Sequence, residues 1–234
     1  HLVHMPAVQD HKQAYVGDAG PNTGGMGSYT DANHNLPFLT EHDVIFARQI
    51  NEQTLYAIQE ECGEEYKGII YGGFIAVRGG VRLIEYNARF GDPEVMNMLS
   101  LLQTSLVDIT KAIVERSLDQ LHVEFAPLAS VCKYVVPQGY PDKPVSGEPI
   151  DITQVDRTKV QLFYGAVDQT ASGLMLTGSR AVGLVATGAT IAEAEQIVEQ
   201  EIKKITGPVF HREDIGTAAL IDERITMLRN LRHV

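Results

Sequence analysis

The hydrophobic pattern of the first half of the chain predicts one long helix followed by a β-hairpin. Apolar residues of 41–62 recur at near-helical spacing directly after Thr40, which is typical of an amphipathic helix with Thr40 as its N-cap. Two apolar runs rich in β-forming residues, 68–77 and 81–86, flank the glycine-containing segment 78–80. Runs of this kind around a glycine turn predict two antiparallel strands.

Polar residues then mark the start of the next helix. Asp92 fits the N-cap position, Pro93 the first helical position and Glu94 the first turn. The pattern predicts a helix from here toward Leu102 and a second helix over about 106–118.

From residue 128 onward the pattern changes to several short strands, which favours an antiparallel sheet. Strands are predicted at 128–136, 160–167, 174–177 and 181–186, with a connection rich in Pro and Gly over 137–149. Thr190 and Glu193 form a capping-box pattern ahead of one more amphipathic helix, and a final helix is predicted over 214–231.

The N-terminal segment reads differently from the rest. Residues 1–8 look like the end of a strand already under way, so we expect the chain to be part of a longer protein. Residues 9–29 contain five glycines, a density that excludes helix and strand and predicts a structured loop. Long ordered loops are usually functional.

Together these elements indicate an α+β fold in two units. With 234 residues and 44% hydrophobic composition, the chain can form two modest cores. The change of pattern places the boundary near 119–126. We therefore predict one unit of residues 1–122 and a smaller, mainly antiparallel β unit with helices over 123–234.

Composition narrows the classes of partner. The chain has 19 Lys and Arg against 30 Asp and Glu, and the net charge of -11 repels polyanions such as nucleic acid. Cys62 and Cys132 form no CxxC pair, which favours a reducing compartment. The longest apolar run, 68–77, is far shorter than the roughly 20 residues of a membrane helix. The sequence thus predicts a cytoplasmic protein without a membrane or nucleic-acid partner.

The strongest candidate site is the end of the second hairpin strand. Side chains alternate along a strand, so Glu85, Asn87 and Arg89 project from one face. Carboxylate and amide oxygens suit Mg²⁺, whose other positions go to water and nucleotide phosphates. An arginine can grip phosphate or carboxylate through two parallel hydrogen bonds. The alternative is an ordinary solvated strand end.

The segment that follows this face offers an anion site. Gly91, Asp92, Pro93 and Glu94 open a helix directly after it, and the free N–H groups and dipole at a helix start favour anions. The alternative is a plain helix cap.

A second cluster lies in the glycine-rich segment. Glycines let backbone N–H groups approach an anionic ligand, and a nearby lysine adds positive charge. The candidate substrate-binding residues here are Asp10, His11, Lys12, Asp18, Pro21, Asn22, Thr23, Gly24 and Gly25. The alternative is a flexible surface linker, although linkers normally lack Asn, Met and Thr at set places among their glycines.

Three other patterns do not predict a site. Ser130-Val-Cys-Lys133 has the outline of an acylating serine motif, but it lies within an alternating strand and is assigned to the core. Residues 183–188 have the outline of a phosphate loop without its lysine. His1, His4 and His11 are too irregularly spaced to predict a zinc site.

The motifs together resemble the glycinamide ribonucleotide synthetase (phosphoribosylamine–glycine ligase) family of the ATP-grasp superfamily. The resemblance rests on DHK at 10–12, GPNTGGMG at 20–27, EYNARFGDPE at 85–94, GYP at 139–141, LTGSR at 176–180, GAT at 188–190 and REDIG at 212–216. It covers nearly the whole chain. It implies the C-terminal part of an ATP-grasp fold, with ATP and Mg²⁺ or Mn²⁺ between two α+β subdomains.

The resemblance also implies roles for the candidate residues. Glu85 and Asn87 would bind the metal, Arg89 would stabilise the transferring phosphate, and the loops 10–27 and 91–94 would hold glycine and the ribose phosphate. In the implied reaction ATP phosphorylates glycine, and the amine of 5-phosphoribosylamine displaces phosphate. The products are glycinamide ribonucleotide, ADP and phosphate, in de novo purine biosynthesis.

Two departures limit the resemblance. Residues 68–77 hold no acid, so Glu85 is the one carboxylate metal ligand that the sequence names. The N-terminal part, which would supply the adenine pocket and phosphate lysines, has no counterpart here, so we expect the chain to be inactive without that partner. The alternatives are another ATP-grasp ligase of purine metabolism and a non-catalytic Mg²⁺- or phosphate-binding module.

Overall fold

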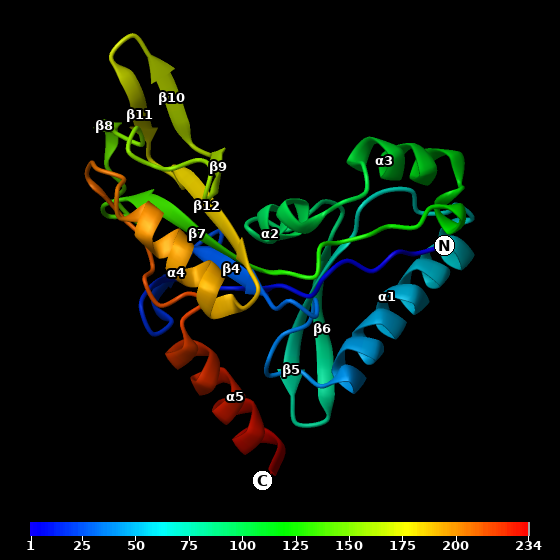
Figure 1. The fold of residues 1–234 in the computed structure, drawn as a ribbon. Helices are drawn as coiled ribbons and strands as arrows, with labels where there is room; N and C mark the ends of the chain where they lie inside the picture. The colour runs from blue at the N-terminus through cyan, green and yellow to red at the C-terminus, as the bar shows by residue number, and fades with distance from the viewer. Residues whose placement is uncertain (234) are drawn as a thin grey trace.

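The central feature of the computed structural model, which describes residues 1–233, is a six-stranded sheet whose paired strands are antiparallel (Figure 1). Five strands lie in the order β1-β4-β7-β12-β9, and β13 pairs with β7. Their bounds are Gln9–Asp10 for β1, Gly27–Thr30 for β4, Ala129–Pro137 for β7, Gln161–Tyr164 for β9, Val182–Gly188 for β12 and Val209–Phe210 for β13. The sheet therefore joins the N-terminal segment to the second half of the chain.

Two helices cover opposite faces of this sheet. The helices are α1 (Glu41–Cys62), α2 (Glu94–Leu101), α3 (Leu106–Glu115), α4 (Ile191–Ile202) and α5 (Ala218–His233), with a short 3-10 turn η1 (Leu118–Gln120). A Cβ built on Gly183 of β12 would lie 2.8 Å from Met96 of α2, whereas one on Gly188 would lie 2.9 Å from Ala194 of α4. Odd and even strand positions face opposite sides. The sheet is thus sandwiched between α2 and α4, and β7 is buried throughout.

The predicted hairpin is confirmed as β5 (Tyr71–Val77) and β6 (Gly80–Asn87), with α1 packed against it. The bounds predicted for α1 are also confirmed, because Thr40 and Asp43 form a capping box at its start. The Asp43 carboxylate accepts two further hydrogen bonds from Arg232 of α5, at 2.7 and 2.9 Å. α5 therefore links this hairpin unit to the rest of the molecule.

The glycine-rich segment contains strands that the sequence analysis excluded. β2 (Gln13–Tyr15) and β3 (Ala19–Asn22) pair with each other, and β1 and β4 join the central sheet, so the prediction of a strand-free loop over 9–29 is wrong. Glycine permits this close packing, since a Cβ at Gly27 (φ +156°) would collide with the carbonyl oxygen of Cys132. Residues 1–8, predicted as the end of a strand, form no strand, although the Ala7 N–H donates to the His34 carbonyl at 3.0 Å.

The second half contains more strands than predicted. β8 (Ser146–Ile150) lies largely in the stretch predicted as a connection, and it pairs with β11 (Gly173–Thr177), which also pairs with β10 (Val167–Thr170). The single strand predicted over 160–167 is two strands, β9 and β10, because the chain leaves the central sheet between them. The two-residue β13 was missed because it is too short to show alternation.

The start of α2 also differs from the prediction. Pro93, not Asp92, is the N-cap residue, and no side chain caps the helix. The Asp92 carboxylate instead accepts hydrogen bonds from Tyr134 and Arg180, each at 2.9 Å. The Asp92 side chain therefore makes tertiary contacts in place of the capping hydrogen bond that the local sequence predicts.

The division at residues 122 and 123 stays a prediction. β4 from the first range pairs with β7 from the second. The buried Asn97 amide of α2 donates to the Ser130 hydroxyl at 3.0 Å and to the Ser28 carbonyl at 3.4 Å. The two predicted units thus share one sheet and part of one core.

Candidate functional site

The side chains at the end of β6 lie on one face, as their alternation predicts. The Asn87 amide donates to a Glu85 carboxylate oxygen at 3.3 Å, and Arg89 donates to the Asn87 side-chain oxygen at 3.4 Å. Arg89 also donates to the Phe90 carbonyl at 2.7 Å. Glu85 and Arg89 are exposed, so both are accessible to a ligand from outside the chain.

This donor set fits a divalent cation. Glu85 offers carboxylate oxygen and Asn87 amide oxygen, the hard ligands that Mg²⁺ and Mn²⁺ take. The cross-strand neighbour of Glu85 is Gly73, which brings no side chain to compete for that carboxylate. On the same strand pair, the Tyr71 hydroxyl donates to Glu94 at 2.8 Å. Glu94 thus places a second carboxylate beside β5, which itself contains no acid.

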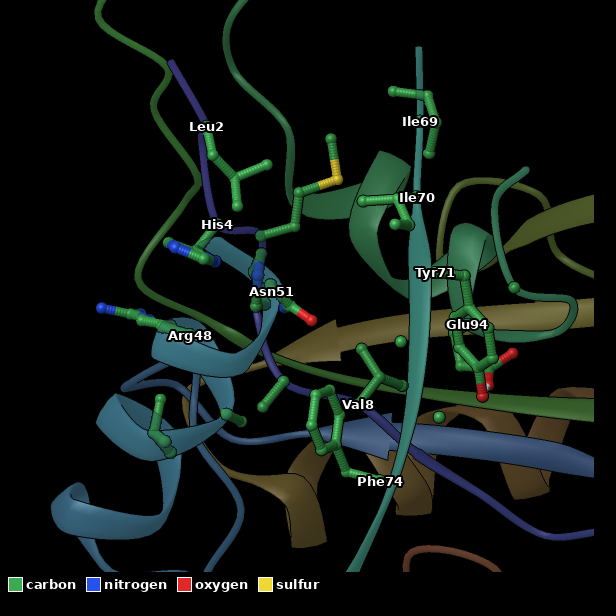
Figure 2. A pocket seen from close by; sticks show the side chains of 18 of the residues that line it. Leu2, His4, Val8, Arg48, Asn51, Ile69, Ile70, Tyr71, Phe74 and Glu94 are labelled. Atoms are coloured by element: carbon green, nitrogen blue, oxygen red, sulfur yellow. Dashed lines mark hydrogen bonds between the residues drawn. The ribbon is translucent and has the colours of Figure 1, made fainter. Parts of the chain in front are cut away.

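A cleft of about 1430 Å³ opens beside this strand pair (Figure 2). Apolar side chains from the N-terminal segment and the β5 region form part of its wall, among them Leu2, Val8, Ile70 and Phe74. The predicted site residues on the wall are Asp10, Lys12, Asn22, Glu85, Gly91 and Glu94. The cleft therefore brings Glu85 and part of the glycine-rich cluster together.

Asp10 is a largely buried carboxylate on the cleft wall. Its Oδ1 atom has no hydrogen-bond partner among residues 1–233. Burial first, and then the Glu94 carboxylate, raise the pKa of Asp10 to about 7, while Lys12 acts in the opposite direction. A carboxyl group in this state can accept a hydrogen bond, or a proton, from an amine near neutral pH.

The loop after β3 is held by hydrogen bonds between side chains and backbone groups. The Thr23 hydroxyl donates to the Lys12 carbonyl at 2.8 Å and accepts from the Gly25 N–H at 3.0 Å. Arg180 donates to the carbonyls of Gly24 and Gly25 at 2.8 and 3.2 Å. Contacts within the chain thus define the shape of the loop, as a positioning role requires.

The loop also touches the segment before α2. A Cβ built on Gly25 would lie 2.5 Å from Pro93 and 2.8 Å from Asp10 Oδ1. The structure therefore brings the two predicted substrate segments into contact at a point where only glycine fits. The anion site predicted at the start of α2 stays a prediction.

Arg180 is a residue of this region that the sequence analysis did not select as a site residue. Its guanidinium donates to the Asp92 carboxylate at 2.9 Å and lies 4.6 Å from the ring centre of Tyr134. It joins the loop at 24–25 to the segment 91–94. The LTGSR motif at 176–180 was the available signal, but it gives no information about a contact so distant in the sequence.

Two predicted substrate-binding residues lie behind the loop rather than on the cleft wall. His11 is 2% exposed, and its Nδ1 atom lies 3.5 Å from Asp18 Oδ1. Asp18 in turn accepts a hydrogen bond from Arg212 at 2.7 Å. Pro21 and Asn22 lie in β3, where the Asn22 side-chain oxygen accepts from Gln13 at 3.3 Å.

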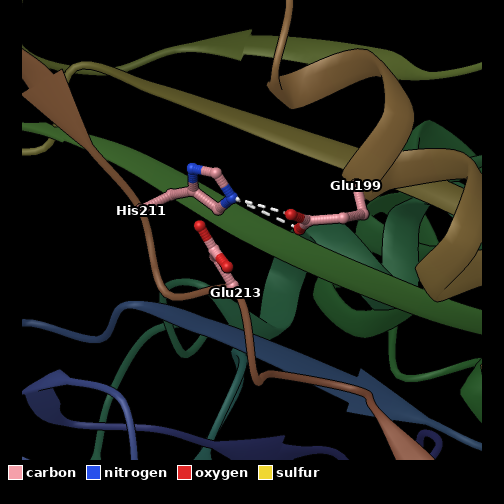
Figure 3. Close-up of side chains that lie close together, drawn as sticks. All are labelled: Glu199, His211 and Glu213. Carbon is pink, nitrogen blue, oxygen red and sulfur yellow. Dashed lines mark hydrogen bonds and ion pairs between the residues drawn. The ribbon is translucent and has the colours of Figure 1, made fainter.

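A third group of side chains, Glu199, His211 and Glu213, has the composition of a metal site (Figure 3). Its potential ligand atoms lie within 4.8 Å of one another. The two Glu199 oxygens, however, already meet the ammonium groups of Lys133 at 2.6 Å and Lys203 at 3.0 Å. A divalent cation would have to displace two ion pairs, so we interpret the group as an ion-pair network. Ser130 and Lys133 are both buried, which confirms their assignment to the core.

Comparison with known families gives two matches. The family described as "Phosphoribosylglycinamide synthetase, ATP-grasp (A) domain" matches residues 1–95, and the corresponding C domain matches residues 130–218. The predicted boundary at 122 and 123 lies between the two matched ranges.

Curated relatives carry matching names. The phosphoribosylamine–glycine ligase of Methanocaldococcus jannaschii is 50% identical over 229 residues, which cover 97% of this chain and 51% of the relative. The ligase of the same name from Methanosarcina barkeri is 47% identical and covers 99% of this chain and 53% of its own length. The chain thus spans about half the length of the curated relatives it matches.

Solved structures give the same fold. The crystal structure of phosphoribosylamine–glycine ligase from Thermotoga maritima matches with a TM-score of 0.78 at 28% identity, over 90% of this chain and 51% of that one. Urea carboxylase from Kluyveromyces lactis shares the fold alone, with a TM-score of 0.64 at 16% identity over 92% of this chain and 18% of that one. No helix within residues 1–233 is long and apolar enough to span a bilayer.

Proposed function

Because the chain belongs to the phosphoribosylglycinamide synthetase family of ATP-grasp ligases in purine biosynthesis, we propose that it supplies the metal-binding strand and the substrate loops of a ligase that joins glycine to 5-phosphoribosylamine. The observation that carries this proposal is the hydrogen-bonded line of Glu85 and Asn87 at the end of β6 and Arg89 two residues beyond it, with Glu85 on the cleft wall. A cytoplasmic location remains part of the proposal.

The proposed reaction has two steps with different needs. A carboxylate oxygen of glycine attacks the γ-phosphorus of ATP, and ADP leaves, which gives glycyl phosphate. The amine nitrogen of 5-phosphoribosylamine then bonds to the glycyl carbon, phosphate leaves and the nitrogen loses a proton. The first step needs positive charge around the phosphate, and the second needs a group that accepts a proton.

The residues on and beside the cleft match both needs. Arg89 offsets negative charge on the transferring phosphate, and Lys12 adds charge on the cleft wall. Glu85 and Asn87 would hold a divalent cation, which when bound neutralises charge on nucleotide phosphates. Asp10, with a pKa of about 7, is suited to hold the proton that the amine releases.

The remaining parts of the ligase are proposed to come from outside this chain. The adenine pocket and the phosphate-binding lysines belong to the N-terminal part, in line with the chain matching about half of its relatives. We therefore propose that the chain alone does not turn over, and that it works together with that part.

A hybrid protein tests this proposal directly. The chain replaces the matching half of the Methanocaldococcus jannaschii relative, and ADP release is followed with glycine and 5-phosphoribosylamine. We expect ADP release that requires both substrates, and none from the chain alone. Alanine, aspartate and formate in place of glycine should support less than about one hundredth of the rate, because the cleft must position one small amino acid.

Two outcomes would favour the alternatives. A hybrid that prefers another small carboxylate would be a different ligase of purine metabolism. A folded hybrid that binds Mg·ATP in calorimetry but releases no ADP with any substrate would be a non-catalytic binding module.

A further inference from the structure

A buried arginine of the C-terminal unit is bonded to the glycine-rich segment from behind. Arg212 has no exposed surface. Its Nε and Nη2 atoms donate to the two Asp214 oxygens at 2.9 and 2.6 Å, and its Nη1 atom donates to Asp18 at 2.7 Å and to the Gln13 carbonyl at 3.2 Å. One guanidinium thus joins a carboxylate of its own segment to two points of the β2–β3 hairpin.

The carboxylate partner of Arg212 holds the same hairpin. Asp214 accepts a hydrogen bond from the Gly17 N–H at 3.0 Å, in the turn between β2 and β3. Asp18 also forms an ion pair with Arg224 of α5. The turn is therefore held by groups that come from a segment about 200 residues later in the chain, as the separations of 197 and 194 residues show.

The network reaches the cleft through His11. Asp18 lies 3.5 Å from His11 Nδ1, and burial first, then Arg212 and Arg224, lower the pKa of His11 to about 3. The imidazole is therefore neutral, and the tautomer with its proton on Nδ1 allows the ring to donate to the Asp18 carboxylate. His11 lies between Asp10 and Lys12, which line the cleft while His11 does not.

Adjacent side chains in an extended segment point to opposite sides of the backbone. Contacts that hold the His11 ring behind the segment therefore also hold the backbone that directs Asp10 and Lys12 toward the cleft. The backbone supports this arrangement: the His11 N–H donates to the Gly27 carbonyl at 3.1 Å and the Met26 N–H donates to the His11 carbonyl at 2.8 Å. A change in the Arg212 network behind this segment would shift Asp10 and Lys12 in front of it.

We infer that Arg212 is a positioning residue, which acts through Asp18 and His11 to hold Asp10 and Lys12 in place on the cleft wall. The inference rests on the proposed function only in assigning those two residues to substrate. Removing the guanidinium leaves Asp18 and Asp214 without their buried cation, which costs stability. Both carboxylates are bonded to the turn between β2 and β3, so the effect is expected to be largest in that segment.

Amide hydrogen exchange of the 234-residue chain tests the positioning without reference to catalysis. In Arg212→Met, amides of 11–27 should exchange at least about tenfold faster, because the segment opens locally, while amides of β7 and α4 should accelerate by a clearly smaller factor. Arg157→Met is the matched control, since Arg157 is exposed and donates to the Tyr164 hydroxyl, and it should change neither region. Unchanged exchange over 11–27, or equal acceleration throughout the chain, would overturn the inference.

Asp18→Asn covers the case in which Arg212→Met fails to fold. It keeps the Arg212–Asp214 pair and weakens the connection to the hairpin, so it should accelerate exchange in the same segment. No acceleration in this variant would equally overturn the inference.

The hybrid ligase adds a readout that a purely structural role would not change. Arg212→Met should lower kcat/KM for glycine or 5-phosphoribosylamine by roughly 10- to 100-fold, while the KM for ATP stays within about twofold, because the metal-type residues lie on β6. An equal loss for ATP would contradict the inference. An unchanged hybrid without any activity counts against the proposed function instead, and hydrogen exchange still decides the role of Arg212.

Discussion

Replacing Glu85 with alanine in the hybrid ligase is expected to lower kcat by about 10²- to 10³-fold, the usual cost of removing one group that stabilises charge in a transition state. Glu85 is the one carboxylate in the line at the end of β6, and it lies on the cleft wall. Without it, Asn87 offers a single neutral oxygen, which holds a divalent cation weakly.

The loss should not come from unfolding. Glu85 is exposed, and its side chain accepts a hydrogen bond from Asn87 at 3.3 Å, a weak contact at the surface. Glu148→Ala is a matched control because Glu148 is an exposed strand glutamate of β8, and its kcat should stay within about twofold. A Glu85→Ala hybrid with kcat within twofold of the unchanged hybrid would remove this residue from the proposed site.

Replacing Lys133 with methionine is expected to destabilise the chain by about 3–5 kcal/mol, measured as the free energy of unfolding in urea. The Lys133 side chain has no exposed surface, and its Nζ atom donates to Glu195 at 2.8 Å and to Glu199 at 2.6 Å. Methionine fills similar space but leaves both carboxylates without their buried cation.

Lys203→Met tests whether burial of the lysine, and not only its positive charge beside Glu199, determines the loss of stability. Lys203 pairs with the same Glu199 carboxylate at 3.0 Å but is 59% exposed, so its loss should cost far less stability than the loss of Lys133. Similar values for the two variants would contradict the ion-pair interpretation of this group.

The ion pairs of Glu199 also predict that the stability of the chain depends on pH. Burial alone would raise the pKa of Glu199, but hydrogen bonds from His211, Lys133 and Lys203 outweigh it and hold the pKa below the usual glutamate value of 4.5. The stabilisation is therefore present above pH 4.5 and is lost as the pH falls below it. Lys133→Met should lose less stability over that acidic range than the unchanged chain.

Local sequence patterns predicted the features that depend on contacts between residues close together in the chain. The capping box at Thr40 gave the start of α1, and alternation gave the shared face of Glu85, Asn87 and Arg89. Both depend on side chains within a few positions of one another, which a sequence displays directly.

Distant contacts explain what the sequence analysis missed. Asp92 reads as an N-cap from its neighbours, but Tyr134 and Arg180 hold its carboxylate elsewhere. His11 reads as a substrate residue beside two others, yet it points to a network built by Arg212 from the other end of the chain. These contacts join residues that are 42 to 194 positions apart, so no local pattern in the sequence displays them.

The proposed function depends on a divalent cation that the end of β6 would hold against nucleotide phosphate. A crystal structure of the hybrid ligase with Mg²⁺ and a non-hydrolysable ATP analogue would show this cation. We expect oxygen atoms of Glu85 and Asn87 at about 2.1 Å from the ion, with the Arg89 guanidinium facing the terminal phosphate. An ion bound by other residues, with Glu85 and Asn87 turned away from it, would rule out this role for β6.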